Sequence, residues 1–326
     1  MKVLFLDEVH PQVSATLTAK GYECLHAEKM EETEVLKLLP SVHGIVLRSR
    51  YRMDNEFLKS AEKLKWIARS GVGMENIDEA YCMSRGISAF NAAGGNADAV
   101  GEHVIGMLLA LFNKISSGDA EVRKGLWRRE AHRGIELGKR KIGIIGFGHT
   151  GKSLAKKLSG FGCEILAFDK YVPVEMEGVK SATLQELEEH CDVISFHVPL
   201  TEETKHYLNA DFIREMKNPF YLVNASRGAV ASTEAIAQGI TQGKILGACL
   251  DVLEEEDHSL ALKAEESQAF KALSTSEKTL FSPHVAGWTL ESYEKLAKVL
   301  LERIKEVDGH LALNKSFDVN ADISKH

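Results

Sequence analysis

Short apolar runs alternate with segments of helical period along most of the chain. The apolar runs have the length of strands, and the segments between them place apolar residues three or four positions apart. This alternation is typical of parallel sheets whose strands are joined by helices. It predicts a first series of strands at Lys2–Asp7, Tyr22–His26, Gly44–Arg48, Trp66–Arg69 and Ile87–Asn91, with helices that include Pro11–Lys20 and Asp54–Ala61.

A second series of the same kind begins after residue 140. Between the two series lie an apolar helical segment, Ala97–Phe112, and a polar stretch from Lys114 to Lys139 that we expect to be a linker and surface arm. Asp257–Lys278 is also polar and predicts a surface loop with a short helix. The strands of the second series are expected at Lys141–Ile145, Glu164–Asp169, Asp192–Val198, Phe220–Asn224, Ile245–Asp251 and Thr279–Ser282.

The last periodic segment, Leu290–Val307, has helical spacing and no strand after it. We expect it to pack back on the first series, which would bring the two chain ends into one domain. The 326 residues are enough for two domains, each with its own core.

The composition is typical of a globular protein and argues against some classes of partner. Hydrophobic residues make up 44% and charged residues 27%, as in ordinary globular domains. The net charge of −7, without a basic tail, argues against nucleic acid and anionic membranes as partners. The longest apolar stretch, Val104 to Phe112, is well short of the roughly 20 residues that cross a bilayer. Val3–Leu6 runs into acidic residues instead of forming the core of a signal peptide, so we expect a cytoplasmic protein.

The cysteines and histidines give no sign of a metal site. The five cysteines are scattered and never form Cys-x-x-Cys, which predicts reduced thiols. The thirteen histidines do not cluster at ligand spacing, so no metal is expected.

A glycine-rich loop follows the first strand of the second series. Gly146-Phe-Gly148-His-Thr-Gly151 opens a segment of helical period, which is the context of the dinucleotide-binding fingerprint. In this interpretation Gly146 makes the tight turn, Gly148 lets a pyrophosphate approach the backbone, and Gly151 brings the helix close to the strand. The helix N-terminus would hold the negative charge.

The same residues also match the phosphate loop of nucleotide hydrolases, Gly-x-x-x-x-Gly-Lys-Ser, with Lys152 for phosphate and Ser153 for magnesium. Asp169 favours the dinucleotide, because it lies 18 residues after Gly151, at the end of the next strand, where a carboxylate binds ribose hydroxyls. Its charge would repel a 2′-phosphate and so favours NAD over NADP. A third hypothesis is that the glycines merely shape a turn.

Three polar residues follow later strands of the second series. Arg227 suits a bidentate grip on a carboxylate, His284 could exchange a proton while a hydride moves, and Glu256 could orient that histidine. Each residue also has a plain structural interpretation. The arginine could form a surface ion pair, the histidine could be structural, and Glu254–Asp257 could be a solvated acidic run.

These motifs together resemble the D-isomer-specific 2-hydroxyacid dehydrogenases, and most of all their phosphoglycerate dehydrogenase branch. The resemblance covers nearly the whole chain. It rests on the glycine loop with Asp169, and on Arg69–Gly73 with Glu75–Asp78, Asn91–Asn96 with Glu102-His103, His197–Thr201, Asn224–Gly228, Leu250–Val252 with Glu256, and Pro283–Gly287.

The resemblance implies an α/β fold of two doubly wound parallel-sheet domains. A flavodoxin-like substrate domain would comprise residues 1–97 and 288–326, and an inserted Rossmann NAD-binding domain would comprise residues 98–287. It also implies a homodimer formed through the NAD-binding domain, with a tetramer as the open alternative.

The resemblance further implies roles for individual residues. Arg227 would bind the substrate carboxylate and carbonyl, His284 would be the acid/base, and Glu256 would hold His284. The NAD contacts would include Val72, Gly146, Gly148, His149, Thr150, Gly151, Asp169, Val198, Ala225, Ser226, Asp251 and Gly287. Substrate contacts beyond Arg227 would come from the backbone of Val72 and Gly73, from Arg48 and Ser49, and from Arg129 of a neighbouring subunit.

The chain departs from the family pattern in two places. Asp257 replaces the proline that usually follows the glutamate, and the 28 positions from Glu256 to His284 exceed the usual spacing by about ten residues, which predicts an excursion of the loop. The sequence ends without a C-terminal regulatory domain, so serine feedback through such a domain is not expected.

The expected activity is NAD-dependent interconversion of a small D-2-hydroxy acid and its 2-oxo acid. The leading reaction is oxidation of 3-phosphoglycerate to 3-phosphohydroxypyruvate in serine biosynthesis, and the nearest alternative is reduction of glyoxylate or hydroxypyruvate. Two hypotheses come from other classes: a non-enzymatic NAD-sensing protein, which would tolerate loss of His284, and a phosphate-loop hydrolase.

Overall fold

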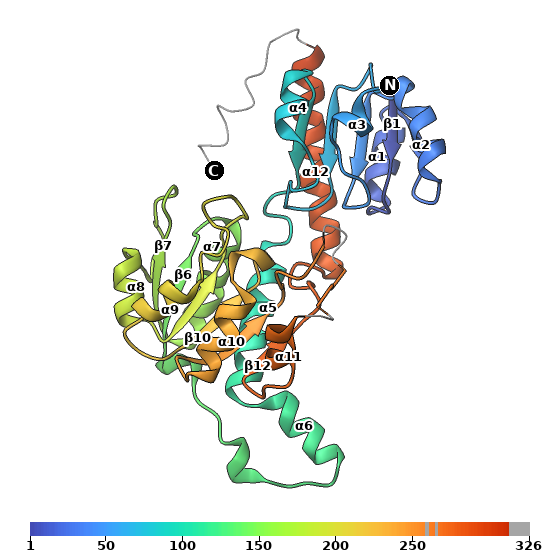
Figure 1. The fold of residues 1–326 in the computed structure, drawn as a ribbon. Coiled ribbons are helices and arrows are strands. Elements are labelled where there is room, and N and C mark those ends of the chain that lie inside the picture. The colour runs from blue at the N-terminus through green and yellow to red at the C-terminus, as the bar shows by residue number, and fades with distance from the viewer. Residues whose placement is uncertain (258–260, 265–266, 313–326) are drawn as a thin grey trace. The chain divides into compact units, whose positions relative to one another are not determined.

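The strands of the protein form two parallel sheets. The computed structural model describes residues 1–257, 261–264 and 267–312. These residues fall into two units, the first made of Met1–Asn96 and the chain from Leu290, the second of Ala97–Thr289 (Figure 1). All pairings between named strands are parallel, which confirms the α/β class predicted from the alternating pattern.

The first unit contains a five-stranded sheet of order β2-β1-β3-β4-β5. This is the flavodoxin-like order, in which the chain starts near the middle and winds outward both ways. The strands are β1 Lys2–Phe5, β2 Glu23–His26, β3 Gly44–Leu47, β4 Trp66–Arg69 and β5 Ser88–Asn91. The helices are α1 Gln12–Ala19, α2 Glu32–Leu38, η1 Leu39–Ser41, α3 Asn55–Leu58, α4 Glu79–Ser84 and α12 Leu290–Ala312.

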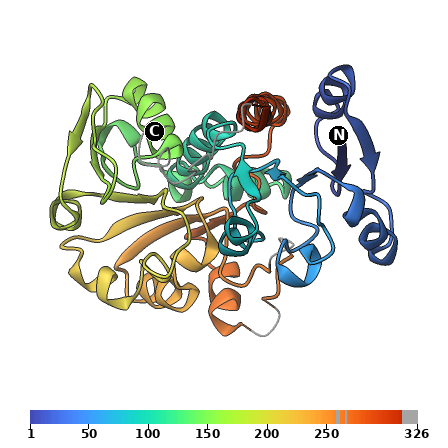
Figure 2. The same cartoon turned by 90° about the horizontal axis from the view of Figure 1, so that it is seen from above.

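Both faces of this sheet are buried, because consecutive side chains of a strand point to opposite faces. Leu4 joins one apolar cluster, whereas Phe5 joins the other. The second cluster also contains Trp66 of β4 and Leu296 and Leu300 of α12. The C-terminal helix, seen end on in Figure 2, therefore packs on the sheet of the first series.

The second unit contains a seven-stranded sheet of order β12-β11-β10-β9-β6-β7-β8. The strands are β6 Lys141–Ile145, β7 Glu164–Phe168, β8 Val179–Ser181, β9 Val193–Phe196, β10 Phe220–Asn224, β11 Ile245–Leu250 and β12 Thr279–Phe281. The sequence did not predict β8. Two of its three residues are exposed, and it lacks the apolar run by which the other strands are found.

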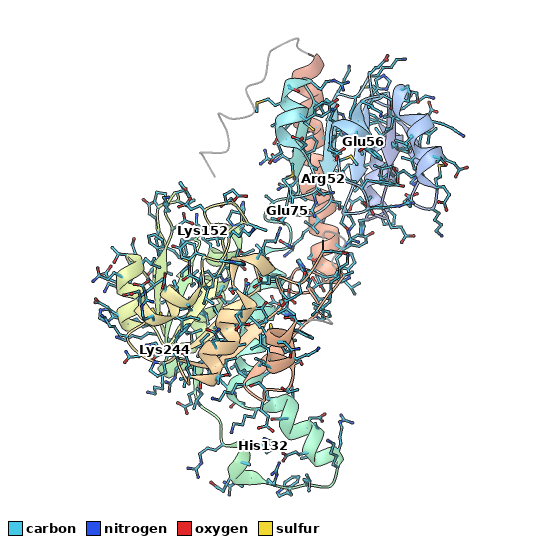
Figure 3. The ribbon with its side chains drawn as sticks, viewed as in Figure 1. Arg52, Glu56, Glu75, His132, Lys152 and Lys244 are labelled. Carbon is cyan, nitrogen blue, oxygen red and sulfur yellow. The ribbon has the colours of Figure 1, made fainter. Side chains whose placement is uncertain are left out.

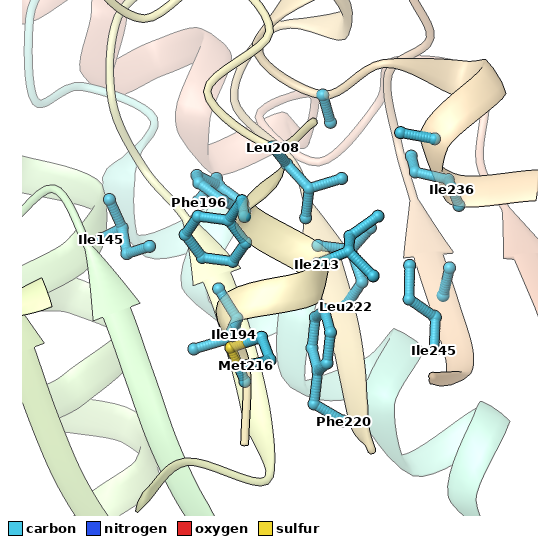
Figure 4. Packing of buried hydrophobic residues seen from close by; sticks show 14 of the residues in the cluster. Ile145, Ile194, Phe196, Leu208, Ile213, Met216, Phe220, Leu222, Ile236 and Ile245 are labelled. Atoms are coloured by element: carbon cyan, nitrogen blue, oxygen red, sulfur yellow. The ribbon is translucent and has the colours of Figure 1, made fainter. Parts of the chain in front are cut away.

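Helices cover both faces of this sheet. They are α5 Ala97–Phe112, α7 His149–Leu158, α8 Leu184–His190, α9 Ala210–Glu215, α10 Thr233–Thr241 and α11 Gln268–Ser274, with short 3-10 turns η3 Leu137–Lys139, η4 Ser159–Phe161 and η5 Gly228–Val230. One core lies on each face. Figure 4 shows one of them, in which Phe196 of β9 packs with Leu208 and with Ile213 of α9.

Several helices begin where a polar side chain accepts a hydrogen bond from a first-turn amide. Such a cap satisfies a backbone donor that has no partner within the helix. The caps are Asp54 at α3, Asp78 at α4, Thr183 at α8, Asn209 at α9, Ser232 at α10 and Ser267 at α11.

The stretch expected to be a linker and surface arm is partly helical. It forms α6 Ile115–Arg123 and the 3-10 turn η2 Arg129–His132, and α6 has no buried residue. Figure 1 shows α6 extending away from the sheet of its own unit. Glu121 of α6 binds Arg128 and, at 2.8 Å, His132, which is labelled in Figure 3. We call residues 114–136 the arm.

Within the described residues, no helix combines the length and the apolar character that a membrane crossing requires.

Candidate active site

The glycine loop lies at the carboxyl end of β6. Gly146 has φ +94°, and an added Cβ would lie 2.7 Å from the backbone carbon of His197. A Cβ on Gly151 would collide with the carbonyl oxygen of Gly146, so these positions exclude any side chain. Gly148 is different, because a Cβ there would meet no protein atom within 4 Å. Its backbone therefore faces open space at the N-cap of α7.

This loop stands where the strand order reverses. β6 pairs with β9 on one side and with β7 on the other, and crevices at such switch points bind ligands in open α/β sheets. His149 and Thr150 form the start of α7, and Val198 follows β9 across the switch point. The amides at the start of a helix and its dipole favour a phosphate. The geometry therefore fits the pyrophosphate of a dinucleotide.

Asp169 directly follows β7 and organises this region. Its Oδ2 accepts the amide of Phe147 at 2.6 Å, and its Oδ1 accepts the amides of Tyr171 and Val172 at 2.8 Å each. These bonds fix the carboxylate beside the glycine loop, at the position that binds ribose hydroxyls in the dinucleotide fingerprint.

His284 and Glu256 form a close pair at the ends of β12 and β11. The Nδ1 atom of His284 lies 2.7 Å from Oε2 of Glu256, and both side chains are half-buried. The other carboxylate oxygen of Glu256 accepts the amide of Leu253 at 2.6 Å. Glu256 thus holds one ring nitrogen of His284, while Nε2 has no hydrogen-bond partner among the described residues.

The loop that carries His284 is anchored by Asp251. His284 has φ +53°, an uncommon conformation for a residue with a side chain. Asp251 is buried and accepts Ser282 Oγ at 2.6 Å and the amides of Val285 and Ala286 at 2.9 Å each. Asp251 therefore fixes the backbone on both sides of His284. Gly287 follows in the same loop.

His103 of α5 is a further member of this network. Its Nε2 lies 2.8 Å from Ser282 Oγ and 3.6 Å from Asp251 Oδ1. Sequence reasoning noted the Glu102-His103 motif without giving it a role. Residues 103 and 282 are 179 positions apart, so only the tertiary fold could reveal the contact.

The Arg227 loop follows β10 and packs against the Glu256 loop. The buried side chain of Asn224 accepts from Ser226 and donates to the carbonyl of Arg227 at 3.0 Å, which closes the Ala225–Arg227 turn. A Cβ on Gly228 would collide with the carbonyl oxygen of Leu253. Arg227, Glu256 and His284 thus follow three neighbouring strands, at one edge of the sheet.

The acidic residues before Glu256 are not a solvated run. Glu254 accepts the amide of Thr233 at the start of α10. Glu255 accepts the hydroxyl groups of Thr233 and Ser267 at 2.9 Å each. Glu254 and Glu255 are therefore held by hydrogen bonds to α10 and to the N-cap of α11, unlike the solvated acidic run that the sequence left open for Glu254–Asp257.

Known proteins resemble this chain in sequence over the residues that form the glycine loop and the His284 loop. Residues 105–286 match the family described as D-isomer specific 2-hydroxyacid dehydrogenase, NAD binding domain. The chain belongs to this family. The matched residues lie within the second unit, and the protein is an NAD-dependent oxidoreductase.

Two relatives of this dehydrogenase carry different names. The chain is 32% identical over 298 residues to a hydroxypyruvate reductase of Thermotoga maritima, covering 91% of this chain and 95% of that protein. It is 33% identical over 307 residues to a D-3-phosphoglycerate dehydrogenase of Archaeoglobus fulgidus, covering 93% of this chain but 56% of that protein. The chain thus spans little more than half of the archaeal relative.

Solved structures show the same fold. The TT0316 protein from Thermus thermophilus has a TM-score of 0.81 with 27% identity, covering 95% of this chain and 97% of that one. A D-lactate dehydrogenase from Aquifex aeolicus, complexed with NAD and lactic acid, has a TM-score of 0.76 with 26% identity, covering 96% of this chain and 97% of that one.

In this dehydrogenase, the phosphate-loop interpretation meets a structural obstacle at Ser153. Its Oγ lies 3.4 Å from Asp98 Oδ1 of α5, and a Cβ on Gly101 of α5 would lie 2.9 Å from the same hydroxyl. Lys152, labelled in Figure 3, lies in the first turn of α7. Because the Ser153 hydroxyl faces α5, it is not placed to bind magnesium beside a phosphate.

Arg48 and Ser49 belong to the first unit and follow β3. Their amides, and that of Arg50, donate to Oδ2 of Asp7 at 2.6, 3.1 and 3.3 Å. The guanidinium of Arg50 donates to three carbonyl groups in the Ala27–Met30 segment. The amides of this loop are therefore already occupied by hydrogen bonds to the Asp7 carboxylate.

The remaining predicted substrate contacts lie in two other places. The Val72 and Gly73 carbonyl oxygens accept from Asn91 and Arg69, respectively, so the loop after β4 is held within the first unit. Arg129 lies exposed in η2, on the arm of the second unit.

Proposed function

We propose that this dehydrogenase interconverts a small anionic D-2-hydroxy acid and its 2-oxo acid, with His284 as the acid/base. The observation that carries the proposal is the 2.7 Å contact between His284 Nδ1 and Glu256 Oε2. It holds the imidazole by one nitrogen and leaves Nε2 for the substrate. A histidine held in this way by a carboxylate is well suited to proton exchange.

Each residue of the proposed triad has its own task. When bound, NAD would supply a nicotinamide ring as the hydride acceptor in oxidation and, as NADH, as the hydride donor in reduction. In oxidation, His284 Nε2 takes the hydroxyl proton, and in reduction it gives a proton to the forming alkoxide. Glu256 stabilises the imidazolium, and Arg227 binds the carboxylate with its planar fork.

Most of the proposed NAD contacts lie in the second unit, in or near the glycine loop and the His284 loop. Gly148 and the start of α7 would receive the pyrophosphate, and Asp169 would bind the ribose hydroxyls. The others are Val72, Gly146, His149, Thr150, Gly151, Val198, Ala225, Ser226, Asp251 and Gly287. Asp251 would act mainly through the loop that it anchors, because its two carboxylate oxygens already accept three hydrogen bonds.

For the substrate, 3-phosphoglycerate is the leading candidate. It is supported by the similarity to the Archaeoglobus fulgidus protein, and it requires that Arg48, Ser49 and a partner's Arg129 bind the phosphate. Hydroxypyruvate or glyoxylate is the second candidate. The carboxylate of Asp7 occupies the amides of the Arg48 loop and adds a negative charge where a phosphate would bind.

The proposed assembly is a cytoplasmic homodimer formed through the arm. Ile115, Val122, Leu126 and Trp127 are exposed on the arm, and Trp127 is 82% exposed. Several exposed large apolar side chains on one segment are typical of protein interfaces. A second copy of the chain would cover them and bring Arg129 to the neighbouring subunit.

The first experiment is an NADH absorbance assay on a small substrate panel. 3-Phosphoglycerate is tested with NAD, and hydroxypyruvate, glyoxylate, 2-oxoglutarate and pyruvate are tested with NADH. We expect turnover of 3-phosphoglycerate that falls in Arg48→Ala and Arg129→Ala. Preference for an unphosphorylated oxo acid would be consistent with the proposed roles of the triad but would contradict the proposed phosphate site. No turnover across the panel would favour an NAD-sensing binding protein.

A further inference from the structure

We propose that Glu255 is a positioning residue that holds Glu256 against His284. The inference rests on the proposed function and deepens it. In this chain two hydrogen bonds to the carboxylate of Glu255 restrict the backbone that leads into Glu256.

Glu255 ties its own segment to two helices. Its Oε2 accepts the hydroxyl of Thr233, the first residue of α10, and its Oε1 accepts the hydroxyl of Ser267, the N-cap of α11. Both bonds are 2.9 Å, and all three residues are buried or half-buried. Hydrogen bonds to a charged acceptor are the stronger ones, so this carboxylate is a firm anchor.

The backbone around Glu256 is fixed in the same way. The carbonyl of Glu255 accepts the amide of Lys263 at 2.9 Å, and Glu256 forms an antiparallel bridge with Leu262. The next amide, that of Asp257, donates to the carbonyl of Ala261 at 2.9 Å. A proline at position 257 could not make this last bond, because proline has no amide hydrogen to donate.

The residues before Glu255 are also held by α10 and η5. Glu254 accepts the amide of Thr233, and Gly228 lies directly against the backbone of Leu253 and Glu254. The residues that lead into Glu256 are therefore fixed by the contacts of Gly228, Glu254 and Glu255. Its carboxylate then meets Nδ1 of His284 at 2.7 Å.

The test compares Glu255→Ala with Glu255→Gln in the full-length protein. Alanine removes both hydrogen bonds, whereas the glutamine amide can accept from one hydroxyl and donate to the other. We expect Glu255→Ala to lower kcat about tenfold, because loss of orientation weakens proton transfer. The KM and Kd for NADH should change less than twofold, and Glu255→Gln should restore most of kcat. The matched control is Glu234→Ala, which removes an exposed carboxylate from the first turn of α10, the helix that Glu255 contacts through Thr233.

Two readouts separate positioning from mere structural support. In the reductive direction, Glu255→Ala should lose activity at a lower pH than the wild type, because a displaced Glu256 stabilises the imidazolium less. The double variant Glu255→Ala/Thr233→Val should have no lower kcat than Glu255→Ala, because the two residues share one hydrogen bond. Unchanged kcat and pH profile in Glu255→Ala would overturn the proposal.

A measurement without substrate keeps this inference apart from the proposed function. The hydrogen-bonded Nδ1 proton of His284 should give a low-field proton resonance, assigned by its loss in His284→Asn. We expect it to persist in Glu255→Gln and to weaken or vanish in Glu255→Ala. If the wild type turns over no substrate, the proposed function fails. If the resonance persists unchanged in Glu255→Ala, the positioning role fails.

Discussion

The main-chain amide of His284 donates to the carbonyl oxygen of Asp251 at 2.8 Å. The carboxylate of the same Asp251 accepts from Ser282, Val285 and Ala286, so a single buried residue holds the backbone before, at and after His284. This arrangement retains His284 at φ +53°. Such strained conformations are stable where several surrounding contacts hold the backbone in place.

Replacement of Asp251 should therefore harm both stability and turnover. Asp251→Ala leaves three donors without their acceptor, and we expect the free energy of unfolding to fall by about 3 kcal/mol. Urea unfolding followed by circular dichroism measures this. Asp211→Ala, an exposed change in α9, should have almost no effect. Equal stability of the two variants would contradict the anchoring role.

Loss of His284 should remove catalysis and spare cofactor binding. Asparagine is the better replacement, because it tolerates the left-handed conformation more readily than alanine. We expect His284→Asn to lower kcat by about 10²- to 10⁴-fold, the usual contribution of an acid/base. NADH binding, measured by fluorescence titration, should stay within a few-fold of wild type. Turnover at the wild-type rate would eliminate His284 as the acid/base.

Two glycines of the same loop should respond in opposite ways. A Cβ on Gly148 meets no protein atom, so Gly148→Val should keep the wild-type Tm and weaken NADH binding by about tenfold or more, because the side chain enters the space for the pyrophosphate. Gly151→Ala should instead lower the Tm, because its Cβ collides with the carbonyl oxygen of Gly146. Unimpaired NADH binding by Gly148→Val would place the cofactor elsewhere.

Asp169 should determine the preference between the two nicotinamide cofactors. Removal of its charge ends the repulsion of a 2′-phosphate, so the ratio of kcat/KM for NADPH to that for NADH should rise at least about tenfold in Asp169→Ala. Asp169→Asn should shift the ratio in the same direction while keeping an acceptor near the Phe147 amide. Asp192→Asn is a matched control, since Asp192 accepts the amide of Lys141 at 2.9 Å. An unchanged ratio in both Asp169 variants would refute the assignment.

The arm should lose a stabilising contribution in acid. Hydrogen bonds from Arg128 and His132 lower the pKa of Glu121 from 4.5 to about 2. A depressed pKa in the folded state means that the contribution is complete above pH 4.5 and is lost as the pH falls through about 2. The protection of α6 against hydrogen exchange, taken relative to the intrinsic rate at each pH, should therefore fall over this range in the wild type. Glu121→Gln should show faster exchange already at pH 7 and little further change in acid.

Much of the architecture could be predicted from the order of residues. Apolar runs such as Lys141–Ile145 and Trp66–Arg69 are strands because fully buried parallel strands need continuous apolar segments. The spacing of Gly146, Gly148 and Gly151 predicted a backbone that must turn tightly and pack closely, and both requirements are local. A short polar strand such as Val179–Ser181 has no such signal, because its pairing with β7 decides its conformation.

The tertiary structure decided what depends on contacts between distant segments. Nothing in the local sequence indicated that Asp251 anchors the His284 loop, that His103 reaches Ser282, or that Asp7 occupies the amides of Arg48 and Ser49. The acidic run before Glu256 was equally ambiguous until α10 and α11 supplied hydroxyl donors to Glu255. Hydrophobic periodicity reports which face of an element is buried. The partner of a polar group, by contrast, is set by strand order and loop packing, which bring together residues far apart in the chain.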